Sequence, residues 1–250
     1  MRSDIKRLVV IPTYNEAENV EILIPRLFQH IPNISILIVD DASPDGTADK
    51  CELMQAKFPQ LFIERRPRKA GLGTAYRFGF AWGLERGFQQ LIEMDADMSH
   101  RVRDLANMLK SAAENPDAGL VIGSRWVKGG STINWPKSRQ LLSRGANLYV
   151  RLMLGMGVAD ATAGFRIYSA ETLRKIKLEE IKSEGYSFQI EMTRAAKHVG
   201  AKIIEVPITF RERESGVSKM SQAIVREALF KVTYWGILRI IRRLMYIKTK

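Results

Sequence analysis

Ile92-Glu93-Met94-Asp95-Ala96-Asp97-Met98-Ser99-His100 is the stretch around which the rest of the chain is interpreted. The mostly apolar residues 91–94 predict the end of a buried strand. If strand geometry continues through Ala96, Asp95 and Asp97 lie on one face, because side chains alternate with a period of two. Two like charges on one face are costly unless a cation or a proton lies between them. Mg²⁺ commonly takes one or two carboxylates together with substrate phosphates. The pair therefore indicates a metal–phosphate site, although Asp-x-Asp also occurs in solvated loops and helix N-caps.

Composition narrows the class of protein and of partner. The 250 residues, 46% hydrophobic and 26% charged, suit a globular protein of one large or two small domains. A net charge of +12 favours acidic partners: nucleic acid, phosphorylated substrates or an anionic membrane surface. The single cysteine, Cys51, excludes an intramolecular disulfide and a cysteine-rich zinc site, and the three histidines lack metal-ligand spacing. With no N-terminal signal and no apolar run near ~18 residues, we expect a reducing cytosolic environment.

Strand and helix patterns alternate over the first 125 residues and predict a mostly parallel sheet flanked by helices. We expect strands at 8–11, 34–39, 61–63, 91–94 and 119–123, and helices at 17–29, 47–58, 75–86 and 103–115, the first capped by Thr13 or Asn15. Ligands bind outside the carboxyl ends of the strands in such a sheet. Four strand ends deliver polar residues to that edge: Tyr14 and Glu16, Asp40 and Asp41, Asp95 and Asp97, and Arg125.

The second half predicts a helix over residues 138–156, with Arg139 and Arg144 on its first turns, a short strand at 167–168, a helix at 188–198 and strands over 203–212. A polar loop follows at 213–219. From residue 221 the pattern is a long helix with an apolar face formed by Phe230, Tyr234, Ile237, Ile241 and Leu244, and with Lys231, Arg239 and Arg242 roughly opposite. Such a basic amphipathic helix favours an anionic membrane surface; the alternative is packing on the domain or on a second subunit.

Three functions are compatible with these residues. A metal-dependent nucleotide-sugar transferase would use the carboxylates for ribose and metal and the basic residues for phosphates. A dinucleotide-dependent oxidoreductase would rest on Gly71-Leu72-Gly73, but Tyr76 stands where that motif needs its third glycine. A nucleic-acid-binding module is suggested by the net charge alone, and no recognition motif supports it.

Ten motifs, in order, resemble the family 2 inverting glycosyltransferases of the GT-A fold, and within them the polyprenol-phosphate (dolichol-phosphate) mannose synthases. The similarity covers about residues 6–222. The motifs are Pro12-Thr-Tyr-Asn-Glu16, Val39-Asp-Asp-Ala-Ser-Pro-Asp-Gly-Thr47, Lys69-Ala-Gly-Leu-Gly-Thr74, Met94-Asp-Ala-Asp-Met-Ser-His100, Gly123-Ser-Arg125, Trp135-Pro-Lys-Ser-Arg139, Ser143-Arg-Gly-Ala-Asn147, Asp160-Ala-Thr-Ala-Gly-Phe-Arg166, Ser187-Phe-Gln-Ile-Glu191 and the stretch from Arg213 to Lys219.

The resemblance implies roles for particular residues. The guanosine of GDP-mannose would be held by Pro12, Tyr14, Glu16, Val39 and Asp41. Asp95, Ala96 and Asp97 would contact the nucleotide, with both carboxylates at Mg²⁺ or Mn²⁺. Arg125, Arg213 and Lys219 would meet phosphate groups, the last two from a loop that closes over the site, and Arg139 would meet the acceptor phosphate. The catalytic set is then Asp97, Arg125, Arg213 and Lys219.

The resemblance also implies the reaction: mannose is transferred, with inversion, from GDP-mannose to a polyprenyl or dolichyl phosphate. We expect a GT-A domain over residues 1–220, with a nucleotide half (1–125) and an acceptor half (126–220), and a membrane-associated helix over 221–250. The enzyme would be peripheral on the cytoplasmic side of a membrane, with a membrane-anchoring subunit as a further partner and no nucleic acid. The alternatives are glucosyl transfer from UDP-glucose and, without catalysis, a basic membrane- or nucleic-acid-binding module.

Two departures from the family pattern stand out. Arg101-Val102 follows His100 where relatives tend to carry a proline, which affects the start of the next helix. No transmembrane pair is appended, unlike many relatives that transfer glucose or aminoarabinose, which favours the mannose-synthase type without settling the sugar.

Overall fold

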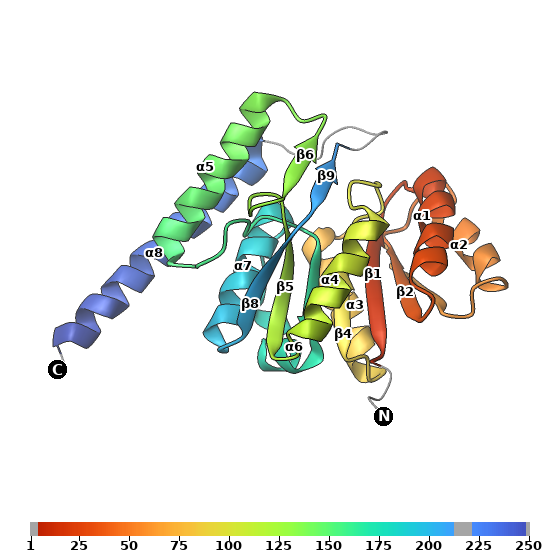
Figure 1. The fold of residues 1–250 in the computed structure, drawn as a ribbon, viewed down its shortest axis with the longest axis horizontal. Helices are drawn as coiled ribbons and strands as arrows, with labels where there is room; N and C mark the ends of the chain where they lie inside the picture. Colours follow the sequence, from red (N-terminus) through yellow and green to blue (C-terminus); the bar gives the residue numbers. More distant parts are fainter. Residues whose placement is uncertain (1–4, 213–221, 249–250) are drawn as a thin grey trace.

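A seven-stranded sheet forms the centre of the molecule (Figure 1). The computed structural model describes residues 5–212 and 222–248. The sheet order is β3-β2-β1-β4-β7-β5-β8, and only β7 runs antiparallel to its neighbours. A second, parallel sheet joins β6 to β9. The strands are β1 Arg7–Thr13, β2 Ile34–Asp40, β3 Leu61–Arg65, β4 Gln90–Glu93, β5 Ala118–Ser124, β6 Ser131–Ile133, β7 Arg166–Ser169, β8 Lys202–Pro207 and β9 Thr209–Arg211. The predicted α/β class with a mostly parallel sheet is confirmed.

Helices cover both faces of the sheet, so the central strands are apolar on both sides. In β1, Val9 and Ile11 pack with α1, α2 and α4, whereas Leu8 and Val10 pack with α3, α6 and α7. The long helices α5 and α8 lie side by side beyond the β8 edge (Figure 1). The helices are α1 Ala17–His30, α2 Thr47–Gln55, α3 Leu72–Glu85, α4 Val102–Glu114, α5 Lys137–Leu154, α6 Ala170–Lys175, α7 Gly185–His198 and α8 Gln222–Lys248, with a short 3₁₀ turn at Leu178–Glu180.

The start of α1 differs from the sequence prediction. Neither Thr13 nor Asn15 caps this helix. Instead, the turn after β2 supplies the acceptors: Ser43 Oγ, Thr47 Oγ1 and Asp45 Oδ2 accept the N–H groups of residues 15, 16 and 17 at 3.1, 3.0 and 3.1 Å. The predicted local cap is therefore wrong, because a side chain distant in sequence satisfies each donor. The turns after β1 and β2 are joined at the edge where ligands would bind.

Glycines let α3 lie close to the sheet. A Cβ on Gly83 would come within 2.7 Å of both Leu8 Cδ2 and Leu91 Cδ2. The helix begins at Leu72, three residues earlier than residue 75, where it was predicted to start. Its N-terminal turn is held by Glu184, whose Oε2 accepts the N–H of Gly73 at 2.7 Å. The helix therefore packs closely along β1 and β4, with its N-terminal turn fixed by Glu184.

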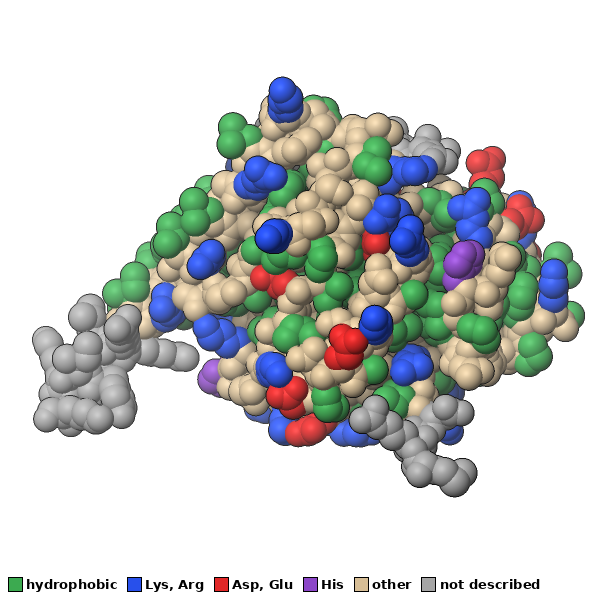
Figure 2. Space-filling view, in the orientation of Figure 1, with side chains coloured by type: hydrophobic (Ala, Val, Ile, Leu, Met, Phe, Trp, Pro, Cys, Tyr) green, Lys and Arg blue, Asp and Glu red, His purple; other side chains and the backbone are tan. Residues whose placement is uncertain are grey.

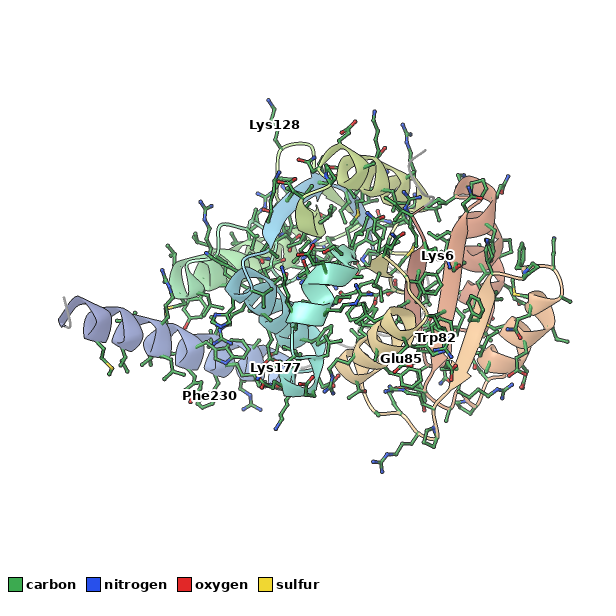
Figure 3. All side chains as sticks on the ribbon, turned by 90° about the horizontal axis from the view of Figure 1, so that it is seen from below. Lys6, Trp82, Glu85, Lys128, Lys177 and Phe230 are labelled. Atoms are coloured by element: carbon green, nitrogen blue, oxygen red, sulfur yellow. The ribbon has the colours of Figure 1, made fainter. Side chains whose placement is uncertain are left out.

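The predicted apolar face of α8 is largely exposed. Phe230 is 73% exposed and points away from the domain, and Tyr234, Ile237 and Ile241 are also exposed (Figure 3). On the other side of the helix, Val232 is buried against α5 and α7. The side chains of Arg242 and Leu244, which the prediction included, lie outside the described part. In the described ranges 5–212 and 222–248, no helix is both long and apolar enough to cross a bilayer.

Candidate active site

The carboxyl ends of four strands meet at one edge of the sheet, as the strand order predicts. β1 and β2 end in register, with Pro12 opposite Val39 and Thr13 opposite Asp40. The pairing of β1 with β4 ends at Val10, so Pro12 has no hydrogen-bonding partner in β4. A proline is tolerated at such a position because it has no N–H to donate. Tyr14 and Glu16 follow β1, and both are half-buried. Side chains from β1 and β2 therefore line the same end of the site.

Asp41 is buried at the end of β2 and is held by the basic loop. It forms an ion pair with Arg66, and its Oδ2 accepts the N–H of Ala70 at 3.0 Å. Arg66 also donates to Thr74 Oγ1 at 2.9 Å, which ties the loop to the first turn of α3. Lys69, from the same loop, lies 3.8 Å above the ring of Tyr14. The loop thus brings two cations to the residues that follow β1 and β2.

Asp95 and Asp97 lie in a loop and not on a continued strand. β4 ends at Glu93 and the chain bends at residues 96–98, so the condition of strand geometry through Ala96 is not met. Met98, with a φ of +62°, lies in this bend. Asp95 Oδ1 accepts a hydrogen bond from the Tyr76 hydroxyl at 3.1 Å, and Asp97 Oδ1 accepts the N–H of residue 99 at 3.1 Å. Burial, and then the nearby Asp95, raise the pKa of Tyr76 well above its usual value, so the hydroxyl stays protonated and donates. The loop is thereby given a fixed shape.

His100 supports this loop from below. Its Nδ1 accepts the backbone N–H of Asp95 at 3.2 Å, and its ring stacks on Phe165 with centroids 4.6 Å apart. Burial lowers the pKa of His100 to about 4, so the ring is neutral near pH 7. A neutral ring is also what the hydrogen bond requires, since a charged imidazole has no acceptor nitrogen.

A buried polar cluster lies beside Asp95. Glu93 and Arg166 are opposite each other in β4 and β7, and both are fully buried. Burial raises the pKa of Glu93 to about 7. The nearby side chain of Gln189 acts in the opposite direction and lowers this pKa in part. The two side chains do not form a hydrogen bond of normal geometry. The Gln189 amide has no hydrogen-bond partner among the described residues, and a Cβ on Gly164 would lie 3.6 Å from its Nε2 and 3.8 Å from Asp95 Oδ2. Buried polar atoms without a hydrogen-bond partner among the described residues therefore lie close to Asp95.

Arg125, after β5, is held in a buried network. Its guanidinium makes a bidentate ion pair with Asp160, with Nε···Oδ2 and Nη2···Oδ1 both at 2.7 Å, and Nη2 also donates to Thr162 at 3.0 Å. Asn147 of α5 donates to Thr162 Oγ1 at 3.0 Å, and Glu205 of β8 accepts the N–H of Asp160 at 3.0 Å. Three motifs far apart in sequence thus fix one guanidinium, whose partner residues carried no predicted role.

Arg139, on the first turn of α5, lies over the ring of Trp135 at 4.1 Å and pairs with Glu212 at 2.5 Å. Its Nε is buried without a partner among the described residues. Arg213 and Lys219, which were predicted to come from a closing loop, lie outside the described residues.

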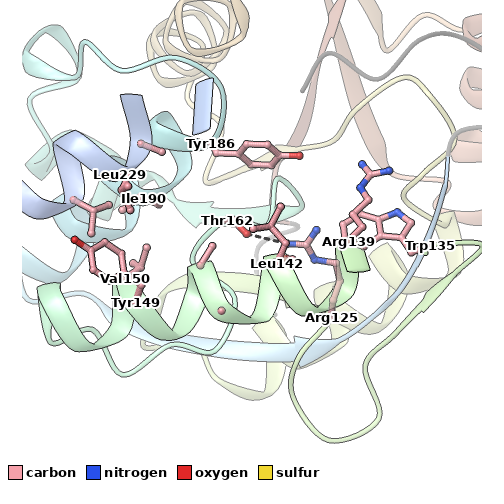
Figure 4. Close-up of a pocket in the computed structure, with 15 residues that line it drawn as sticks. Arg125, Trp135, Arg139, Leu142, Tyr149, Val150, Thr162, Tyr186, Ile190 and Leu229 are labelled. Carbon is pink, nitrogen blue, oxygen red and sulfur yellow. Dashed lines mark hydrogen bonds between the residues drawn. The ribbon is translucent and has the colours of Figure 1, made fainter. Parts of the chain in front are cut away.

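A cavity of about 440 Å³ opens between α5, α7 and α8, with Arg125 and Arg139 at one end (Figure 4). Beyond them its walls are mostly apolar. The lining includes Leu142, Tyr149, Val150, Ile190, Leu229 and Val232, and the hydroxyl-bearing residues Ser143 and Thr162. A long apolar ligand with an anionic head would place its head on the arginines and its chain between the helices.

Sequence comparison assigns the family. Residues 8–177 match the family model "Glycosyl transferase family 2". The chain belongs to glycosyltransferase family 2. An undecaprenyl-phosphate mannosyltransferase of Micrococcus luteus is 50% identical over 230 residues, 92% of this chain and 93% of the relative. A polyprenol monophosphomannose synthase of Mycolicibacterium smegmatis is 50% identical over 233 residues, 93% of this chain and 87% of the relative. The predicted family is confirmed, and the protein is an enzyme.

Solved structures share the fold of this glycosyltransferase. Glucosyl-3-phosphoglycerate synthase of Mycobacterium tuberculosis, in complex with phosphoglyceric acid, superposes with a TM-score of 0.70 at 16% identity, covering 93% of this chain and 80% of that one. A mannosyltransferase of Pyrobaculum calidifontis, in complex with GDP-Man and Mn²⁺, gives a TM-score of 0.60 at 18% identity, covering 95% and 64%. At these identities the likeness concerns the fold alone.

The loop of this glycosyltransferase fits a hard divalent cation. Asp95 and Asp97 would supply carboxylate oxygens, and the hydroxyl of Ser99 is buried without a hydrogen-bond partner among the described residues. Within that part of the chain, no group of three or more His, Cys, Asp or Glu side chains could hold a metal. A cation here would need further oxygens from a ligand, as Mg²⁺ does when it binds with substrate phosphates.

The sequence alone predicted no role for the side chains that hold Arg125 and the loop of Asp95 and Asp97. Tyr76 positions the acidic loop, and Gln189 lies close to Asp95. Arg125 is positioned by Asn147, Asp160 and Thr162. All of these residues except Tyr76 stood in the quoted motifs, which was the available signal.

Proposed function

We propose that this glycosyltransferase transfers mannose from GDP-mannose to a polyprenyl phosphate, with inversion and with a divalent metal, giving polyprenyl phosphate mannose and GDP. The observation that carries the proposal is the cavity between α5, α7 and α8, which has Arg125 and Arg139 at one end and mostly apolar walls beyond them. The names of the two relatives that are 50% identical point to the same acceptor and sugar.

The donor would bind along the carboxyl ends of β1, β2 and β4. In this proposal Pro12, Tyr14, Glu16, Val39 and Asp41 hold the guanosine, and Asp95, Ala96 and Asp97 contact the nucleotide. When bound, Mg²⁺ or Mn²⁺ at the two carboxylates would neutralise charge on the leaving diphosphate. The Gln189 amide and the Glu93 carboxyl, buried close to Asp95 without hydrogen-bond partners among the described residues, would lie beneath the sugar.

The acceptor phosphate would lie between Arg125 and Arg139. One of its oxygens forms a bond to C1 of mannose while the bond from C1 to the diphosphate oxygen breaks, so the configuration at C1 inverts and the electron pair leaves with GDP. A phosphate monoester is already an anion at pH 7, with a second pKa near ~6. No general base is needed, and the protein's contribution is positioning and charge stabilisation. Arg213 and Lys219 are proposed to add phosphate contacts from their loop.

Membrane association follows from the acceptor. The exposed apolar face of α8 continues past the cavity, so the polyprenyl chain could pass from the cavity into a bilayer without crossing water. We propose a peripheral enzyme on the cytoplasmic side of a membrane; a membrane-anchoring subunit, where present, would bind near the same face.

One assay tests the reaction. Purified enzyme is given GDP-mannose or UDP-glucose, with and without a polyprenyl phosphate, in Mn²⁺ or in excess EDTA. We expect a mannosylated lipid only with GDP-mannose, acceptor and metal, detected by mass spectrometry. Glucosyl transfer from UDP-glucose would instead establish the sibling activity, and undiminished transfer in EDTA would exclude the metal.

A further inference from the structure

A second cavity lies on the opposite side of α5 from the acceptor cavity. It has a volume of about 360 Å³ and is lined by Trp126, Arg144, Asn147, Leu148, Arg151, Val158 and Ala159. Four of these residues, at positions 144, 147, 148 and 151, share one face of α5, because residues three, four and seven apart lie above one another on a helix. Neither the family resemblance nor the proposed reaction gives this cavity a role.

Arg144 and Arg151 give the cavity two positive charges that form no ion pair within the described residues. Both are exposed, and no ion pair joins either to a carboxylate of the described chain. By contrast, Arg125 and Arg139, on the acceptor side, pair with Asp160 and Glu212. The 18 residues of α5 contain four basic side chains and no Asp or Glu.

The second cavity also has a rigid and partly apolar wall. The guanidinium of Arg144 lies over the ring of Trp126 with a separation of 4.8 Å, which limits the orientations of this long side chain. Leu148 lies between the two arginines on the same helical face and is 56% exposed. Two cations beside an exposed leucine complement an anionic head that carries an acyl chain.

α5 separates the two cavities and presents leucines outward between them. Leu141, Leu148 and Leu152 are 75%, 56% and 68% exposed and follow one another along the outer edge of the helix. Figure 2 shows hydrophobic and basic side chains together over this edge of the molecule. A membrane that met this edge would bring lipid phosphates to the level of the arginines.

We propose that this second cavity binds the phosphate headgroup of an anionic phospholipid in the membrane on which the enzyme works. Arg144 and Arg151 would contact the phosphate, and Leu148 would contact the start of an acyl chain. The choice of a lipid over a free anion rests on the proposed reaction, which takes place at a membrane, and on the exposed leucines.

The test measures binding without any donor sugar, so its failure leaves the proposed reaction untouched. Dihexanoylphosphatidylglycerol, a water-soluble monomer, is titrated into protein labelled with ¹⁵N-tryptophan. We expect saturable shifts of the Trp126 indole resonance and none at Trp82, which lies at α3. Inorganic phosphate should bind more weakly because it lacks the chain that meets Leu148; equal binding of phosphate would identify a free-anion site and overturn the proposal.

Vesicles give the second measurement. The variant R144Q/R151Q is compared with R103Q/K110Q, which removes two exposed charges at the same seven-residue spacing on α4. On phosphatidylcholine vesicles containing about a third phosphatidylglycerol, we expect R144Q/R151Q to lose about 25-fold in affinity, since each basic residue at an anionic surface contributes roughly fivefold, and the control to lose less than about twofold. Equal losses in the two variants would show general charge attraction and contradict a site.

Activity separates this cavity from the acceptor site. With a short-chain, water-soluble polyprenyl phosphate and no vesicles, R144Q/R151Q should transfer mannose at the wild-type rate. A raised KM for that acceptor would place the two arginines in acceptor binding and overturn the proposal.

Discussion

Asp97 is the single side chain on which we expect transfer to depend most. It is buried, its Oδ1 accepts the N–H of Ser99, and it lies in the loop that fits a divalent cation. Asp97→Asn keeps the shape and removes the charge, so we expect transfer to fall by about 10³-fold or more while the fold is retained. Asp117→Asn, at an exposed ion pair with Lys202, is the matched control. Wild-type turnover in D97N, measured with GDP-mannose and a polyprenyl phosphate, would contradict the metal assignment.

Two buried groups near this loop should give opposite pH dependences of stability. The pKa of Glu93 is raised from 4.5 to about 7, so the folded state keeps a proton that the unfolded state loses, and stability falls as pH rises across that interval. The pKa of His100 is lowered from 6.5 to about 4, so stability falls as pH drops across that interval. In the wild type the two effects largely cancel.

Substituting Glu93 and His100 one at a time should therefore reveal the two pH dependences separately. In EDTA, E93Q should become more stable relative to wild type as pH rises from about 5 to about 7, and H100N less stable, each by about 2 kcal/mol in the free energy of unfolding. Urea unfolding at the two pH values measures both slopes. Slopes of the same sign in the two variants would refute the assigned environments.

At the residue scale, the sequence identified Asp95, Asp97 and Arg125 as candidate site residues, but it did not identify the side chains that bond to them. Asp95 and Asp97 could be found locally, because their spacing after an apolar run carries the signal. The ion pair of Arg125 with Asp160 could not, since the two residues are 35 positions apart and meet only when β5 lies beside the loop before β7. The condition that Asp95 and Asp97 share a strand face also failed, because β4 ends at Glu93 and the chain bends from residue 96.

At the scale of elements, the predicted strands were recovered to within about two residues because each is an apolar, β-branched run bounded by turn residues. Neither β6 nor α6 was predicted, since a strand of three residues and a helix of six carry almost no periodicity. The predicted cap of α1 was wrong for a different reason. The N–H groups at the start of this helix donate to Ser43, Thr47 and Asp45, which follow the next strand along the chain.

The closeness of α3 to the sheet gives a prediction for its glycines. Gly83→Ala should destabilise the protein by about 1–3 kcal/mol, because the new methyl group would meet Leu8 and Leu91. Gly145→Ala, in α5, is the control: nothing lies within 4 Å of its added methyl group, so better helix propensity should stabilise by up to about 1 kcal/mol. Urea midpoints compare the two, and a stabilised G83A would disprove the close packing.

At the scale of the whole molecule, the exposed face of α8 should control membrane binding. Removing the helix would also expose the core around Val232, which is 1% exposed, so surface substitutions are the cleaner experiment. F230S/I237S should reduce the vesicle-bound fraction in a flotation assay by more than tenfold, because each inserted side chain contributes about 2 kcal/mol. Leu53→Ser, 80% exposed on α2 at the other end of the molecule, should change nothing. Undiminished flotation of F230S/I237S would refute a membrane role for this face.

The acceptor cavity could not be predicted from the sequence because it exists only where three helices pack together. Its walls come from α5, α7 and α8, which are separated by up to about a hundred residues, and each wall alone is an ordinary amphipathic helix. The amphipathic pattern of α8 was visible; which of its residues face a cavity, and which face outward, depends on the crossing with α5.

Where α5 and α8 cross, Gly155 and Arg239 lie against each other. Gly155 ends α5 with a φ of +60°, and the guanidinium of Arg239 from α8 fills the space that a Cβ at position 155 would occupy. Arg239 in turn donates to the carbonyl of Met153 at 3.2 Å. A side chain at position 155 would therefore have to displace the flexible end of Arg239, and it would also adopt a φ of +60°, which favours glycine. Loss of the arginine would remove the first obstacle and leave the second, so we expect position 155 to keep its glycine even in chains that lack Arg239.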